Sequence, residues 1–259
     1  MGLIGICGKM NSGKDLTGQI IEYLTGKDYQ SYEKIRIEKE LPVDYYLGHV
    51  KHGVTWEIRK FADKLKEIVC IMIGCKRSDL EDREFKETPL GEEWWYYILP
   101  RTNHDELLTL EEYSNLTDNQ KGWCELVKPT PRLLLQLLGT DCGRKIIHPN
   151  VWVNALMSDY KPKDAPYNNL GNLFDDLKQG LANIPNWIIT DVRFPNEVKA
   201  IKDRKGIVIR KLGEYTSTET HESETALDNT EVDHEIPYCE DIETLTNIVR
   251  EILIKEKVL

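Results

Sequence analysis

The chain has 259 residues, 40% of them hydrophobic, which is enough for one large domain or two small ones with a packed core. Its formal net charge of −10 argues against broad binding of a nucleic-acid polymer, because such binding needs a basic surface. We expect neither a membrane span nor a secretory signal, since apolar runs are short and the chain starts with a predicted strand. Six cysteines without a C-x-x-C pair indicate reduced thiols and a cytoplasmic location.

A strand, a glycine-rich turn and a helix are predicted at the N-terminus. The apolar run 2–7 predicts a buried strand, and residues 14–25 predict an amphipathic helix that ends at Gly26. Between them, residues 8–15 match the first seven positions of the phosphate-binding pattern G-x-x-x-x-G-K-[ST]. The eighth position is Asp15, where serine or threonine is usual. The alternative interpretation is a glycine-rich turn with a solvated lysine.

Phosphate binding is the chemistry that this loop favours. Its glycines let successive N–H groups turn toward a phosphate chain, and the following helix adds the positive end of its dipole. Asp15 is a candidate Mg²⁺ ligand, because Mg²⁺ prefers hard oxygen donors, although its charge would also favour the start of the helix. We expect ATP to be held by Gly8, Asn11, Ser12, Gly13, Lys14, Asp15 and Leu16.

The middle of the chain combines two regular elements with a long charged segment. Residues 27–53 are polar and are expected to be irregular, and a strand over 54–61 and a helix over 62–74 follow. Residues 76–130 are rich in charges and aromatic side chains. Within a single domain over 1–259, they form either an inserted lid or substrate-binding region, or a surface excursion that packs on itself.

A further helix is predicted to begin at Pro131, with Thr130 as its N-cap and a break at Gly139. If the helix continued past that glycine, polar residues four apart would form a stripe. These residues are Arg132, Gln136, Thr140 and Arg144. Such a stripe suits an anionic ligand that carries a base or sugar, and the alternative is an exposed polar face. Residues 150–160 predict another helix, and residues 161–183 a loop with some helix.

The last third of the chain predicts a parallel β-α-β unit and a final helix. Strands over 187–191 and 206–212 flank a helix over 197–204. Residues 213–235 are expected to be loop, and residues 240–256 to form an amphipathic helix.

Asp191 ends the first of these strands, as the carboxylate that holds or orients Mg²⁺ does in many phosphate-binding proteins. Lys14 and Asp191 both lie at the carboxyl ends of strands, where open α/β sheets bind their ligands. The alternative is that Asp191 caps the turn before Pro195. Arg193 is expected to approach the same phosphates. A cluster over 221–224 could bind a metal, but it lacks a second pair of ligands.

Several motifs together resemble one family. Besides residues 8–15, they are 61–67, 82–86, 130–141, Arg144, 152–153, 190–197 and 221–224. The T-P-R-x-L-L-Q-x-L-G-T and D-V-R-F-x-N-E stretches are the most specific of them. In this combination, over residues 3–227, the chain resembles the deoxynucleoside monophosphate kinases of tailed bacteriophages.

The resemblance implies a P-loop kinase fold, in which helices flank a central, mostly parallel sheet. It also implies transfer of the γ-phosphoryl group of ATP to a deoxynucleoside monophosphate, with Mg²⁺, in the cytoplasm of the host cell. Catalytic positive charge would come from Lys14, Arg132, Arg144 and Arg193. The monophosphate would contact Asp63, Lys64, Arg83, Lys86, Arg132, Gln136, Arg144 and Trp152. The metal would be held by Asp15 and Asp191.

Two other functions remain open at this point. One is another small-molecule P-loop kinase, with an acceptor such as dephospho-coenzyme A or a sugar acid. The other is a nucleotide-regulated switch of the GTPase type, although the guanine-binding signature N-K-x-D does not occur in the sequence. The oligomeric state is also open, with a homodimer as one candidate.

Overall fold

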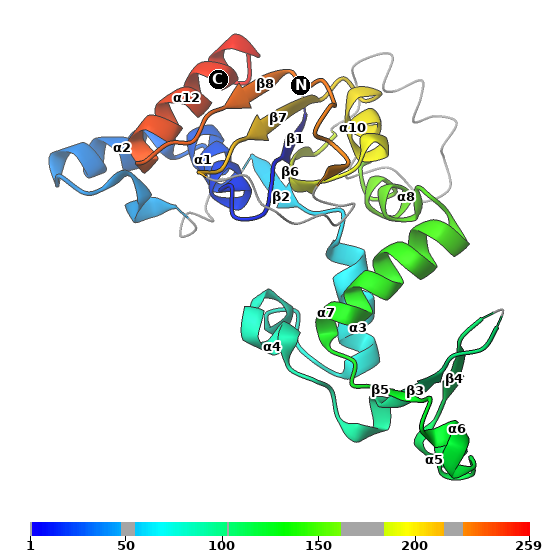
Figure 1. Ribbon diagram of the computed structural model, residues 1–259. Coiled ribbons are helices and arrows are strands. Elements are labelled where there is room, and N and C mark those ends of the chain that lie inside the picture. The colour runs from blue at the N-terminus through cyan, green and yellow to red at the C-terminus, as the bar shows by residue number, and fades with distance from the viewer. Residues whose placement is uncertain (1, 48–54, 103, 162–183, 215–224) are drawn as a thin grey trace. The chain divides into compact units, whose positions relative to one another are not determined.

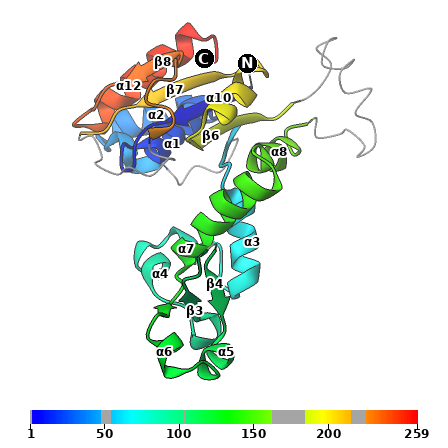
Figure 2. The same ribbon diagram turned by 45° about the vertical axis from the view of Figure 1, so that its right-hand side comes forward.

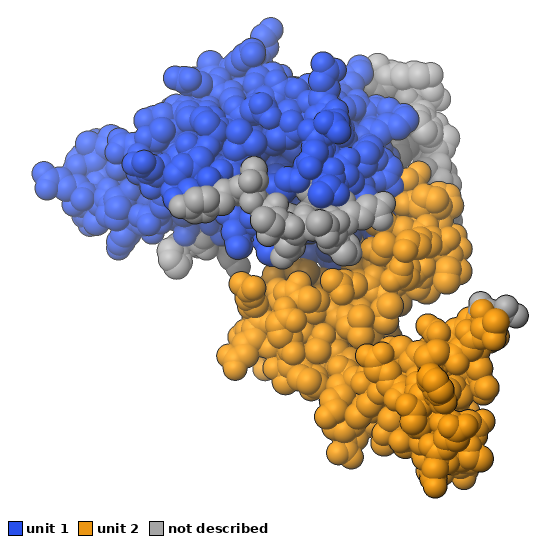
Figure 3. All heavy atoms as spheres, viewed as in Figure 1, with its two compact units in different colours: residues 1–63, 152–259 blue, residues 64–151 orange. Residues whose placement is uncertain are grey.

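The computed structural model describes residues 2–47, 55–102, 104–161, 184–214 and 225–259. The chain divides into two compact units, which Figure 3 shows in different colours. The first unit contains residues 1–63 and 152–259, and the second contains residues 64–151. Within the described ranges, no helix is long and apolar enough to cross a bilayer.

A five-stranded parallel sheet forms the centre of the first unit (Figure 1). In sheet order its strands are β2 (Trp56–Arg59), β6 (Asn186–Val192), β1 (Leu3–Cys7), β7 (Ile207–Lys211) and β8 (His234–Ile236). Each neighbouring pair is parallel, so all five carboxyl ends lie at one edge of the sheet. The expected β-α-β unit is confirmed, with β1 inserted between its two strands.

Alternating apolar side chains give the sheet two buried faces. Ile4 and Ile6 of β1 pack with the helices α1 (Lys14–Thr25) and α12 (Ile242–Lys255). Leu3 and Cys7 of the same strand pack on the opposite face with α8 (Val151–Met157) and α10 (Pro195–Lys202). The expected α/β class, with helices flanking a parallel sheet, is therefore confirmed.

Two expectations for this unit are wrong. Residues 29–38, expected to be irregular, form the helix α2 (Tyr29–Glu38), and a short 3₁₀ turn follows at Val43–Tyr46. Helix α2 has no buried residue, so its sequence lacks the apolar periodicity from which helices are predicted. Strand β8 lies in a segment expected to be loop, because its three residues are too short to show a pattern.

The second unit contains short helices and a small sheet (Figure 2). Its antiparallel sheet has the order β4 (Glu106–Leu108), β3 (Tyr96–Leu99) and β5 (Glu125–Val127). The helices are α3 (Asp63–Ile73, whose first residue belongs to the first unit), α4 (Arg83–Glu87), α5 (Leu110–Ser114), α6 (Asp118–Lys121) and α7 (Pro131–Gln136). Short 3₁₀ turns occur at Asp79–Glu81 and Glu92–Trp94.

The expected break at Gly139 is also wrong. Helix α7 begins as predicted, with Pro131 in its first turn and the Thr130 side chain accepting the N–H of Leu133. It then continues as a π-helical segment over Leu137–Ile147. Gly139 is buried, and a Cβ atom there would lie 2.9 Å from Cδ2 of Leu65. The glycine thus serves close packing rather than the end of a helix.

Candidate active site

The loop between β1 and α1 has the backbone shape of a phosphate cradle. Gly8, Asn11 and Gly13 have positive φ angles of 149°, 60° and 89°. Residues with positive φ are interspersed here with ordinary ones, as they are in the concave backbone segments that bind anions. At Gly8 a Cβ atom would lie 2.3 Å from the carbonyl oxygen of Lys211, so only glycine fits.

Two side chains of this loop are suited to an anionic ligand. The Ser12 hydroxyl is buried, and it has no hydrogen-bond partner among the described residues. A buried polar atom without a partner is rare, and a bound phosphate oxygen would satisfy it. The Lys14 ammonium donates to the carbonyl oxygens of Gly8 and Lys9, at 2.8 and 2.6 Å. It therefore lies against the loop in which the phosphates would bind.

Asp15 lies beside this loop in the first turn of α1, and two residues from neighbouring strands hold it. Its Oδ1 atom accepts a hydrogen bond from Thr190 Oγ1 on β6, at 2.6 Å. Lys60 Nζ, just after β2, lies 2.9 Å from the same oxygen. Burial raises the pKa of Asp15, but the bonds from Thr190 and Lys60 outweigh it and hold the pKa below its usual range. Asp15 is thus an ionised, exposed carboxylate at the carboxyl edge of the sheet.

Asp191 has a different environment, although it follows Thr190 directly. Its two carboxylate oxygens accept the backbone N–H groups of Phe61 and Ala62, at 2.7 and 3.0 Å. Burial raises its pKa, and these two bonds offset the rise only in part. Asp191 therefore ties the end of β2 to β6. The turn before Pro195 is capped by Glu197 instead, which accepts the N–H groups of Arg193 and Phe194.

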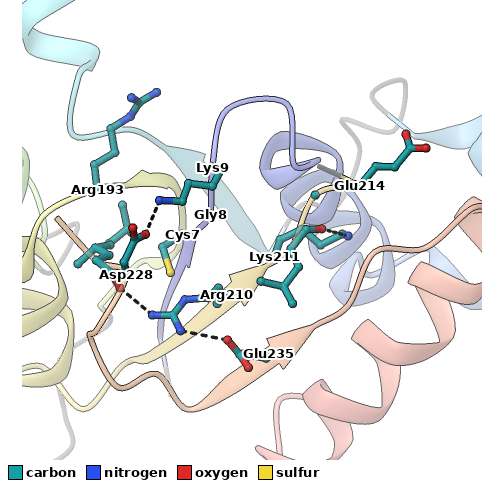
Figure 4. Close-up of a pocket in the computed structure, with 13 residues that line it drawn as sticks. Cys7, Gly8, Lys9, Arg193, Arg210, Lys211, Glu214, Asp228 and Glu235 are labelled. Atoms are coloured by element: carbon teal, nitrogen blue, oxygen red, sulfur yellow. Dashed lines mark hydrogen bonds and ion pairs between the residues drawn. The ribbon is translucent and has the colours of Figure 1, made fainter. Parts of the chain in front are cut away.

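A cavity of about 460 Å³ borders the loop on the side of β7 and β8 (Figure 4). Both basic and acidic side chains line it: Lys9, Arg193, Arg210, Lys211, Glu214, Asp228 and Glu235. Lys9 forms an ion pair with Asp228 at its rim. Its size falls within the range of about 300–1,000 Å³ that small-molecule pockets occupy.

Arg210 organises the wall of this cavity. Its guanidinium donates to the carbonyl oxygens of Leu227 and Thr230, at 2.9 and 2.6 Å, and it pairs with Glu235 at 3.0 Å. These bonds tie residues 227–230 to β7 and β8 (Figure 4). Burial raises the pKa of the neighbouring Cys7 thiol, so the cysteine is a packing residue rather than a nucleophile.

Within the second unit, several of the expected acceptor residues lie close together. Arg132 forms an ion pair with Glu87 at the end of α4. Burial lowers the pKa of Lys86, and the nearby charges of Lys66 and Arg132 lower it further. Lys66 in turn pairs with Glu81 at 2.9 Å. The unit therefore contains three neighbouring cations, Lys66, Lys86 and Arg132, of which Lys66 and Arg132 also pair with carboxylates.

The other residues that were expected to contact the acceptor have different environments. Asp63 accepts the backbone N–H of Lys60 at 2.9 Å, and Lys64 lies 3.9 Å from Glu67. Trp152 is buried. Three more residues are at least partly accessible: Arg83, Gln136 and Arg144. The cluster over 221–224 lies outside the described residues.

The loop and its surroundings fit a magnesium–nucleotide complex. The backbone of residues 8–13, the Ser12 hydroxyl without a partner and the Lys14 ammonium are suited to binding a phosphate chain. Asp15 provides the kind of hard oxygen ligand that Mg²⁺ prefers. In the part of the chain that the structure describes, no three His, Cys, Asp or Glu side chains gather as a metal site. Mg²⁺ is commonly bound by one or two carboxylates together with phosphate oxygens and water, which this arrangement allows.

Sequence reasoning identified the loop but missed Lys60 and Thr190. Both lie far from the loop in sequence and reach it only through the pairing of β2, β6 and β1. The signal available for Thr190 was its position next to Asp191 at the end of an apolar strand. The signal for Lys60 was its position at the end of a predicted strand.

Comparison with known proteins finds a similarity along most of the chain. No protein-family model matches the chain. The chain is similar to the deoxynucleoside-5'-monophosphate kinase of Escherichia phage T5, with 25% identity over 249 residues. The match covers 90% of this chain and 88% of that protein. This similarity confirms the resemblance that the motifs indicated, and together with the parallel sheet it shows an α/β P-loop kinase fold.

Proposed function

We propose that the protein is an ATP-dependent deoxynucleoside monophosphate kinase, which transfers the γ-phosphoryl group of ATP to a deoxynucleoside monophosphate and yields the diphosphate and ADP. The observation that carries the proposal is the cradle over residues 8–13, with the orphaned Ser12 hydroxyl and the Lys14 ammonium on it. The similarity to the phage T5 kinase supports a nucleotide kinase function along most of the chain. We expect it to act in the cytoplasm of an infected cell.

The donor phosphates would lie along the backbone N–H groups of residues 8–13. Lys14 would exchange its bonds to the carbonyls of Gly8 and Lys9 for bonds to the β- and γ-phosphates. Asp15 is the residue that would hold Mg²⁺, which when bound neutralises negative charge on the transferring group. Asp191, the other expected ligand, already accepts backbone N–H groups with both oxygens and would act beside the metal by holding the end of β2. Arg193 lines the adjoining cavity and would add a positive charge near the phosphates.

The acceptor would bind through the cations of the second unit. Arg132, Lys86 and Arg83 are the proposed contacts of its phosphate, with Arg144 as a further catalytic cation. Its nucleoside would contact residues such as Gln136, with Lys64 of the same unit as a further proposed contact. The other two residues that the resemblance implies, Asp63 and Trp152, belong to the first unit. The acceptor oxygen already belongs to an ionised phosphate, so no general base is required. Catalysis then consists of in-line positioning and charge neutralisation.

A coupled assay of ADP formation tests this function. Purified protein would be given Mg-ATP and, separately, dAMP, dGMP, dCMP, dTMP and AMP. We expect turnover with at least one deoxynucleotide, reduced on the order of 100- to 1,000-fold by Lys14→Ala, because one positioned donor to the transition state is lost. Lys27→Ala, which removes an exposed lysine just beyond α1, is the matched control and should retain activity.

Two results would contradict the proposal. Tight ATP binding without turnover of any monophosphate would direct the search to other acceptors or to a nucleotide switch. Equal turnover in wild type and Lys14→Ala would show that the loop does not carry the reaction.

A further inference from the structure

We propose that Thr190 is a positioning residue, which holds the Asp15 carboxylate where it can bind the divalent cation of bound ATP. Compared with the usual P-loop, the hydroxyl and the carboxylate are then found at each other's positions. In the usual arrangement a serine or threonine follows the loop lysine, and an aspartate at a strand end accompanies it. Here Asp15 follows the lysine, and the hydroxyl that meets it comes from β6. The inference rests on the proposed use of Mg-ATP.

The contact between the two side chains is direct and local to the cradle. Thr190 Oγ1 donates to Asp15 Oδ1 at 2.6 Å, a short bond typical of a hydroxyl and a charged oxygen. Thr190 is 1% exposed, whereas the Asp15 side chain is 65% exposed. The hydroxyl is therefore fixed in the protein, and the carboxylate that it holds is open to a cation from solvent.

Thr190 faces the loop because of strand alternation. Ile188 of β6 packs on the face covered by α1, and Thr190 lies two residues further on, so it shares that face. The pairing of β1 with β6 is irregular after Ile189, and there both oxygens of Asp191 accept the backbone N–H groups of Phe61 and Ala62. The strand residue in contact with the first turn of α1 is thus the threonine.

The packing around Thr190 keeps its hydroxyl in place. Its Cγ2 methyl lies against Gly18 of α1, where a Cβ atom would come within 2.5 Å of it. A β-branched side chain held through its methyl group has little freedom about χ1, so its hydroxyl keeps one direction. Lys60 also contacts Asp15 Oδ1, at 2.9 Å. Both of these contacts involve Oδ1, and we assign Oδ2 to the cation.

The test compares ATP affinity in Mg²⁺ with affinity in EDTA, by isothermal titration calorimetry on the full chain. Thr190→Val keeps the shape and the methyl group but loses the hydroxyl, and Thr190→Ser keeps the hydroxyl as the matched control. We expect Thr190→Val to reduce the Mg²⁺-dependent gain in affinity roughly 10- to 100-fold, as losses of residues that orient metal ligands do. Affinity in EDTA should stay within about twofold, because the cradle remains. Thr190→Ser should lose less of the Mg²⁺-dependent gain than Thr190→Val, because it keeps the hydroxyl that donates to Asp15, although not the methyl group that packs on Gly18.

A structural role for Thr190 would give a different result. If Thr190→Val weakened ATP binding equally with and without Mg²⁺, or left the Mg²⁺ dependence unchanged, the inference would be overturned. If circular dichroism showed that Thr190→Val does not fold, Asp15→Asn would serve instead, because it must lose the same Mg²⁺-dependent gain. An Asp15→Asn protein with wild-type Mg²⁺ dependence would also overturn the inference.

The same measurements separate this inference from the proposed function. ATP binding needs no acceptor, so the Mg²⁺ dependence can be measured even if no monophosphate is phosphorylated. A wild-type protein without kinase turnover, in which Thr190→Val still abolishes the Mg²⁺-dependent gain, would refute the kinase and support the role of Thr190. If the wild-type protein shows kinase turnover and Thr190→Val leaves the Mg²⁺-dependent gain in ATP affinity unchanged, the kinase function would be supported and the role of Thr190 refuted.

Discussion

Replacing Gly18 by alanine is expected to destabilise the protein, although alanine is the better helix former. In the middle of a helix this change normally stabilises by about 1 kcal/mol. Here the new Cβ atom would lie 2.5 Å from Cγ2 of Thr190, whereas carbon atoms in contact stay about 3.5–4.0 Å apart. Helix α1 would have to move away from β6 by about 1 Å. Such overpacking costs about 1–3 kcal/mol, so we expect a net loss of about 1 kcal/mol.

A double-mutant cycle isolates this contact. Thr190→Ser removes Cγ2 and keeps the hydroxyl, so in that background Gly18→Ala should meet only the ordinary contacts with Ile188 and Ile58, at 3.6 and 3.7 Å. There the substitution should be neutral or stabilising, which gives a coupling energy of about 1–2 kcal/mol. Urea-induced unfolding followed by far-UV circular dichroism measures all four proteins.

Gln19→Ala serves as the control for helix propensity, since it changes the neighbouring residue of the same helix and should stay within about 0.5 kcal/mol of wild type. A Gly18→Ala protein that is more stable than wild type, by the same amount in both backgrounds, would refute the close approach of α1 to β6. It would also weaken the inference on Thr190, because that inference needs the same packing.

Two further predictions concern carboxylates. Burial alone would raise the pKa of Glu81, but bonds from two cations, Lys66 foremost, hold it at about 2, below its ordinary 4.5. Its stabilising contribution should therefore be present above pH 4.5 and be lost as the pH falls toward 2. Glu81→Gln should flatten the pH dependence of the urea midpoint in that window, by less than about 1 kcal/mol because the side chain is half exposed. Glu197→Leu should lower stability by about 1–3 kcal/mol in urea unfolding at pH 7, because it removes the buried oxygen that accepts two backbone N–H groups; an unchanged midpoint would exclude that role.

The sheet and most of its helices could be predicted because their signals are local. Strands β1 and β6 are short apolar runs, and α1 and α12 bury one regular face. Elements without a buried face gave no such signal, which is why α2 was missed. At Gly139 the prediction failed for another reason: glycine was interpreted as a helix end, whereas here it lies inside a helical segment and packs closely against Leu65.

In the candidate site, too, only the residues that are close together in the sequence could be predicted. The cradle could be located because its glycines and Lys14 are consecutive in the sequence, and the backbone angles agree with that prediction. Lys60 and Thr190 could not be located, because they join the site through strand register rather than through sequence proximity. Strand alternation alone also does not say whether Thr190 or Asp191 faces the loop, since that depends on which face α1 covers.

The contacts of Asp15 explain how a carboxylate can occupy a site built for phosphate. A negative charge beside a polyphosphate repels it, and in the low dielectric of a protein that repulsion is larger than in water. A lone Asp15 would therefore weaken binding of free ATP. Lys60 reduces the repulsion on one oxygen, and a divalent cation between the carboxylate and the phosphates would turn it into attraction. A loop that ends in a neutral hydroxyl needs no such cation to avoid repulsion. If the loop binds Mg-ATP as proposed, the aspartate at position 15 would make nucleotide affinity depend more strongly on Mg²⁺, and Thr190, by holding the carboxylate in place, would determine how much of that dependence is realised.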